Sequence, residues 1–97
     1  MRIIARRALH EFWIQHAEAK SPLEAWYHEV KLAIWSKSAD VKARYPRASI
    51  VSNERVVFDI CNNTYRLVVV IKYKFQVVYI RFIGTHAEYG RIDAKEI

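Results

Sequence analysis

The sequence has little cysteine, glycine or proline. Cys61 is the only cysteine, which excludes an internal disulfide and a cysteine-built zinc site. Two Gly and two Pro leave no flexible linker and no low-complexity segment. The longest apolar run, Leu67 to Ile71, is far shorter than the roughly 18 residues of a membrane-spanning helix. The opening residues lack the apolar region of a signal peptide. We therefore expect one cytoplasmic domain over residues 1–97.

The charges are unbalanced. Sixteen Lys and Arg against ten Asp and Glu give a net charge of +6 and a pI of about 9.7. This excess favours an anionic partner, either nucleic acid or an acidic protein surface, although a basic domain that is merely soluble has the same composition. Aromatic residues make up 13% of the chain, but they serve cores, interfaces and base stacking alike.

Helical periodicity dominates the first part of the chain. Apolar residues recur at three- and four-residue spacing over Ile4–Glu18, which predicts an amphipathic helix. Ser21 as N-cap, with Glu24 three residues later, predicts a second helix whose apolar face extends to Ile34. A short third helix is expected near Ala39–Tyr45, before a proline.

The second part alternates with the period of β-strands. Strands are predicted at Arg55–Cys61, Thr64–Tyr73 and Val77–Ile83, with turns at Asn62-Asn63 and Lys74-Phe75. The expected fold class is therefore α+β. It has two N-terminal helices packed on one face of a small, mostly antiparallel sheet, and a short C-terminal helix.

Two-residue turns would fix the strand register. Asp59 would then lie opposite Arg66, Val70 opposite Tyr79, and Val68 opposite Arg81. Strict alternation also assigns the two faces of the last strand. It places Val78, Ile80 and Phe82 on the apolar face and Val77, Tyr79, Arg81 and Ile83 on the polar one.

Charged residues on the polar face of the sheet are the first functional candidates. Arg66 and Arg81 occupy central strands, where an unpartnered charge is disfavoured. Arg66 has two interpretations, a cross-strand pair with Asp59 or a phosphate clamp. Arg81 has no carboxylate opposite it, which favours anion binding. Lys72 lies at a strand end, where solvation is the favoured explanation for a lysine.

The segment after the last strand is the second candidate. Thr85 and Glu88 form a capping box, so a short helix should begin at His86 and carry Tyr89 on the same side. An imidazole, a phenol and two guanidinium groups would suit metal-free RNA cleavage by the substrate 2′-hydroxyl. The structural alternative is a capping or packing role for His86 and a core role for Tyr89.

Other polar residues give weaker signals. His10, His16 and His28 lack ligand-spaced partners, so no metal site and no cofactor are expected. The basic stretch that contains Lys42 and Arg44 is compatible with a solvated face or with contacts to an RNA backbone.

The sequence resembles the HigB family of toxins of type II toxin–antitoxin systems, in the RelE-like superfamily. The resemblance rests on segments 55–60, 63–69 and 79–89, on the opening residues and on the helix at Ala25–Val30. The Tyr65-Arg-Leu67 and Thr85-His-Ala-Glu-Tyr89 motifs are its most specific parts. It implies a ribosome-dependent mRNA endonuclease that is neutralised by a HigA-type helix-turn-helix antitoxin. Operator DNA would be bound only through that antitoxin.

The resemblance also implies roles for individual residues. Four positions match catalytic or phosphate-contacting residues, namely Arg66, Arg81, His86 and Tyr89. Contacts to RNA are expected from Lys72, Tyr79, Lys42 and Arg44. The sequence departs from the family at Gly90, where an Asp often follows the His-Ala-Glu-Tyr motif.

Two other functions fit the same residues. A non-catalytic module that binds RNA or the ribosome would need the cations and aromatics but no proton transfer. An interaction subunit would use the basic face to bind an acidic protein partner. The first alternative predicts that His86→Ala leaves the biological effect largely intact. The second predicts that charge reversal at Arg66 and Arg81 abolishes complex formation without any effect on RNA.

Overall fold

The computed structural model describes residues 1–97 as a five-stranded sheet with helices, and the predicted α+β class is confirmed. In chain order the elements are β1 (Arg2–Ile4), α1 (Arg6–Gln15), the 3-10 helix η1 (Ala17–Ala19), α2 (Lys20–Leu32), α3 (Ser38–Arg44), β2 (Ser49–Ile50), β3 (Arg55–Ile60), β4 (Tyr65–Lys72), the 3-10 helix η2 (Tyr73–Phe75), β5 (Val77–Thr85) and α4 (His86–Tyr89). None of the helices combines the length and the apolar character that crossing a membrane requires.

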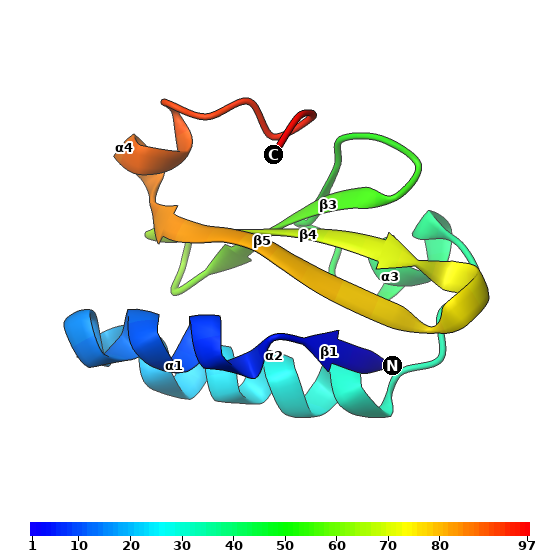
Figure 1. Cartoon of the computed structure of the whole chain (residues 1–97), viewed down its shortest axis with the longest axis horizontal. Coiled ribbons are helices and arrows are strands. Elements are labelled where there is room, and N and C mark those ends of the chain that lie inside the picture. The colour runs from blue at the N-terminus through cyan, green and yellow to red at the C-terminus, as the bar shows by residue number, and fades with distance from the viewer.

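The sheet has the strand order β1-β5-β4-β3-β2. β1 runs parallel to β5, and the other neighbouring strands are antiparallel. Helices α1 and α2 lie against one face, here called the inner face (Figure 1). Their apolar sides join the inner-face side chains in one core of 17 buried residues, which includes Leu9, Trp26 and Phe58. Burial of each such side chain contributes about 1.5–3 kcal/mol.

The start of the chain differs from its helical pattern. Arg2–Ile4 form β1, which pairs with Val77–Tyr79 at the sheet edge, and α1 begins only at Arg6. The predicted helix over Ile4–Glu18 is therefore too long at both ends. Hydrogen bonding to β5 decides the structure of the first residues, and a 3-10 turn replaces the last helical turn.

Helix α2 also has different ends from those predicted. It begins at Lys20, directly after η1, and its N-cap residue Ala19 makes no side-chain cap; Ser21 lies inside the first turn. The helix ends at Leu32, and the chain beyond it is extended. Ile34 is therefore 84% exposed instead of lying on the apolar face.

The β3–β4 hairpin has the predicted register. Asp59 faces Arg66 across the ladder. The connecting turn places Cys61, Asn62 and Asn63 at positive φ, a conformation that Asn tolerates well. On β3, Val56, Phe58 and Ile60 enter the core as expected from their alternation.

A β-bulge at Arg81 changes the second half of β5. Val70 faces Tyr79 as predicted, but Val68 faces Phe82 and not Arg81. One extra residue in β5 exchanges the faces of all later residues. The predicted assignment is therefore wrong for Phe82 and Ile83: Ile83 packs against the core, and Phe82 turns to the opposite face with Val68.

Candidate functional site

The sheet face opposite α1 and α2 is here called the outer face. Alternation and register place these residues on it: Arg55, Val57, Asp59, Arg66, Val68, Val70, Lys72, Tyr79, Arg81, Phe82 and Gly84. Val57 and Val68 are buried there, and the segment after α4 returns over this side of the sheet (Figure 1). The outer face is thus an apolar floor with charged groups around it.

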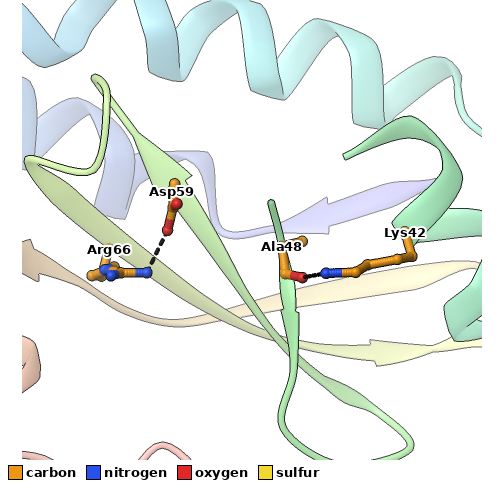
Figure 2. A network of polar contacts seen from close by, with 4 residues as sticks. All are labelled: Lys42, Ala48, Asp59 and Arg66. Atoms are coloured by element: carbon orange, nitrogen blue, oxygen red, sulfur yellow. Dashed lines mark hydrogen bonds and ion pairs between the residues drawn. The ribbon is translucent and has the colours of Figure 1, made fainter. Parts of the chain in front are cut away.

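Arg66 and Asp59 form an ion pair on this face. Their backbones are direct cross-strand neighbours, and the Arg66 guanidinium donates to the Asp59 carboxylate (Figure 2). The side chains are only 16% and 18% exposed. The Tyr89 ring covers the guanidinium, with 5.5 Å between the Arg66 Cζ atom and the ring centroid. The pair therefore lies in a partly dehydrated place, where charge interactions are stronger than in water.

Helix α4 is fixed by the predicted capping box. The Thr85 N–H donates to Glu88 Oε1 at 2.8 Å, and the Glu88 N–H donates to Thr85 Oγ1 at 3.1 Å. Hydrogen bonds from the backbone N–H and the side chain of Thr85 lower the pKa of the Glu88 carboxyl, and nearby positive charge lowers it further. The box starts the helix at His86, whose side chain is exposed, and positions Tyr89 over Arg66.

Gly84 allows α4 to fold closely onto the sheet. A Cβ atom at this position would lie 2.6 Å from Phe82 Cζ and 3.0 Å from Glu88 Oε1. The Phe82 ring thus occupies the space beside Gly84 on the outer face, and Gly84 lies directly across the ladder from Arg66. A side chain at residue 84 would compete with both the ring and the capping carboxylate.

A second group of cations lies further along the same face and consists of Arg55, Lys72 and Arg81. Together with Tyr79 and Val70, these residues line a hollow of about 330 Å³. Lys72 forms an ion pair with Glu54 at 2.8 Å, and the Arg55 guanidinium donates to the Ile97 carbonyl. No carboxylate lies within ion-pair distance of Arg81, in agreement with the sequence prediction.

The basic stretch around α3 is engaged in internal contacts. Lys42 Nζ donates to the Ala48 carbonyl at 2.5 Å, which closes the connection between α3 and β2 (Figure 2). Arg44 forms an ion pair with Glu29 of α2. Arg44 also lines a hollow of about 200 Å³ that Arg47 and Asp59 border. This hollow connects the basic stretch to the carboxylate that holds Arg66.

The structure therefore brings some candidates together and separates others. Arg66 and Tyr89 are in contact, and His86 lies on the same short helix as Tyr89. Arg81 lines the second hollow with Lys72 and Tyr79. No group of three or more His, Cys, Asp or Glu side chains is arranged to hold a metal ion.

Sequence reasoning missed two residues of this face. Arg55 lies on the same side of its strand as Asp59, and this alternation is the signal that could have identified it as a site residue. Phe82 was assigned to the core, because nothing in the alternation of residues 77–83 reveals the bulge.

Helices on one face of a five-stranded sheet and cations on the other define a basic α+β domain. Over residues 19–92, the sequence matches the HigB_toxin family, the RelE-like toxic component of a toxin-antitoxin system. The chain belongs to this toxin family. The matched region contains β2 to β5 and α2 to α4, and so all residues of both cation groups. Comparison with curated proteins finds no match.

Proposed function

We propose that this protein is a ribosome-dependent mRNA endonuclease that inhibits translation as the toxin of a type II toxin–antitoxin system. Membership of the toxin family supports the biological role. The observation that carries the chemical part is the contact between Arg66 and Tyr89, beside the helix that begins with His86. Cleavage of an RNA phosphodiester requires proton transfer and positive charge at the phosphate, which an imidazole and a guanidinium can supply.

The proposed reaction uses the 2′-hydroxyl of the RNA as nucleophile. The hydroxyl gives up its proton as its oxygen attacks the adjacent phosphorus, and the departing 5′-oxygen of the next nucleotide takes up a proton, which leaves a 2′,3′-cyclic phosphate and a 5′-hydroxyl. His86 makes one of these two proton transfers, because an imidazole can accept and donate a proton, and water makes the other. Arg66 stabilises the charge that develops on the phosphate, and Arg81 provides further positive charge on the same face. Tyr89 stacks on a base or orients the nucleotide.

The Arg66 guanidinium can serve both its internal partner and a phosphate. Nη1 donates to Asp59, and Nε is buried without a hydrogen-bond partner. A guanidinium has several donors in one plane, so a single carboxylate does not saturate it. Asp59 holds the side chain in place, and the Tyr89 ring limits its movement from the other side.

The expected partners follow from this function. A helix-turn-helix antitoxin of the HigA type would neutralise the toxin, and operator DNA would be bound only through that antitoxin. Tyr79 and Lys72 would contact mRNA on the outer face. Lys42 and Arg44 would contact it at the adjoining edge of the sheet, where Arg44 borders the same hollow as Asp59.

Mapping of new 5′ ends on a reporter mRNA in a translating extract tests the proposal. The wild-type protein should create ends that require ribosomes, and these ends should disappear with Arg66→Ala and with His86→Ala. His28→Ala is the matched control, because this histidine is exposed on α2, away from the outer face. Thermal unfolding of every variant separates loss of activity from loss of the fold.

The outcomes are distinct. If the folded wild-type protein creates no ends, the nuclease function is wrong and a binding function takes its place. If the ends persist with His86→Ala but not with Arg66→Ala, the protein is a nuclease with a different proton-transfer group.

A further inference from the structure

We propose that the hollow lined by Arg55, Lys72, Tyr79 and Arg81 is a second phosphate site, which binds the backbone of the RNA strand at a distance from the cleaved bond. This inference rests on the proposed function for the identity of the ligand. It adds Arg55 to the RNA-binding residues. It also gives Arg81 a binding role in this hollow, apart from the group around Arg66.

The charges around the hollow favour an anion. Arg55, Lys72 and Arg81 contribute three positive charges, and the Glu54 carboxylate pairs with Lys72. Arg81 is exposed and has no acidic partner, so its guanidinium is available to a ligand. Arg55 donates one N–H group to the Ile97 carbonyl and has further donors.

The aromatic residue of the hollow favours a nucleotide over an acidic peptide. Tyr79 is 37% exposed and lies on β5 directly across the ladder from Val70. It lines the hollow together with Arg81 of the same strand. A ring beside several cations is the usual arrangement for single-stranded nucleic acid, where a base stacks while the cations bind phosphate. A peptide carboxylate would use the cations but not the ring.

The position of the hollow fits one continuous strand of RNA. Arg66 and Val70 both point to the outer face and are four positions apart on β4. That separation is about 13 Å along the strand. An extended RNA whose cleaved phosphate lies at Arg66 would therefore place a phosphate a few nucleotides away in the hollow around Val70 and Tyr79. Two contacts on a rigid sheet would also fix the direction of the strand.

The test measures binding of a fluorescein-labelled 2′-O-methyl RNA decamer, which lacks the nucleophile and is not cleaved. Fluorescence anisotropy over a range of salt concentrations gives the affinity and its salt dependence for wild type and for Arg55→Ala, Lys72→Ala and Arg81→Ala. Lys20→Ala is the control, since it removes one exposed charge at the start of α2. A hexaglutamate peptide is the second probe.

We expect each of the three outer-face variants to weaken decamer binding by about tenfold. The slope of log affinity against log salt should become shallower by about 0.7 for each lost phosphate contact. Arg81→Lys, which keeps the charge, should recover most of the slope, and Lys20→Ala should bind like wild type.

Two results would overturn the second site. One is decamer binding by Arg55→Ala and Arg81→Ala with the affinity and salt slope of wild type. The other is an effect of these variants on hexaglutamate alone, which would assign the hollow to an acidic protein. Because the decamer cannot be cleaved, this result is independent of the 5′-end mapping. A protein without nuclease activity can still bind RNA at the hollow, and an active nuclease can lack the second site.

Discussion

Arg66 lies directly across the β3–β4 ladder from Asp59, and their side chains form an ion pair beneath the Tyr89 ring. This relationship joins the neighbouring strands β3 and β4 to the last helix, α4. The pair is less than one-fifth exposed, in contrast to the surface pair of Arg7 and Glu11, whose side chains are 86% and 59% exposed. The two pairs should therefore differ strongly in their contribution to stability.

Replacing Arg66 by Ala should lower the free energy of unfolding by about 1–3 kcal/mol, because it leaves a half-buried carboxylate without its partner. The double variant Asp59→Asn/Arg66→Ala should recover most of this loss. Urea unfolding measures both values. Arg7→Ala serves as the control and should change the free energy by no more than about 0.5 kcal/mol. If Arg66→Ala and Arg7→Ala lower the free energy of unfolding equally, the pair of Arg66 and Asp59 contributes no more to stability than a surface pair.

Gly84→Ala should destabilise the protein by about 1 kcal/mol, because the new methyl group meets Phe82 Cζ and the Glu88 carboxylate. Gly90→Ala is a matched control. Its Cβ would have 3.4 Å to the nearest atom, and its φ of −63° suits any residue, so it should be neutral or slightly stabilising. Thermal unfolding gives the comparison. A second change, Phe82→Leu, should relieve the effect at residue 84; if it does not, the ring is not the obstacle.

The capping box should make α4 sensitive to acid. Hydrogen bonds from Thr85 lower the pKa of Glu88 below its ordinary value of 4.5. A group with a lowered pKa stabilises the fold above its unfolded pKa, and this contribution disappears as the pH falls through the folded value. The chemical shift of the Thr85 amide proton should therefore titrate below about pH 4.5. Glu88→Gln keeps an acceptor without a charge, so its amide shift should stay constant over this range.

Lys42→Met should affect stability as well as any contact with RNA. Removal of the ammonium leaves the Ala48 carbonyl without its donor, which should cost about 1 kcal/mol in the free energy of unfolding. Lys37→Met is a suitable control, because Lys37 is exposed at the start of the same helix. Urea unfolding measures stability, and decamer binding measures the role in RNA recognition. If Lys42→Met is as stable as Lys37→Met, the hydrogen bond from Lys42 to the Ala48 carbonyl does not contribute to stability.

Local signals in the sequence predicted the parts of the site that depend on local interactions. The Thr85 and Glu88 capping box and the pairing of Asp59 with Arg66 both follow from residues that are near each other in the chain. The ends of the first helices were predicted less well. The strand at Arg2–Ile4 exists because β5, more than seventy residues later, offers an edge to pair with. No local pattern contains that information.

The face of Phe82 was beyond sequence reasoning for a different reason. Alternation predicts faces only while each residue of one strand opposes one residue of the next. Around Arg81 the residues on both sides are apolar, so the pattern fits the core with or without a bulge. Packing of Ile83 against the core decides between the two arrangements, and that packing depends on the helices below.

The bulge at Arg81 also determines which genetic changes this chain can accept. Substitution of Arg81 by another residue keeps the number of residues in β5, so it leaves the strand phase and the position of α4 unchanged. Deletion of that single codon would remove the extra residue of the bulge, so Phe82 would still oppose Val68 on the outer face and Ile83 would still face the core, as regular alternation requires. The bulge therefore adds a guanidinium to the outer face, but the faces of the residues that follow do not depend on it.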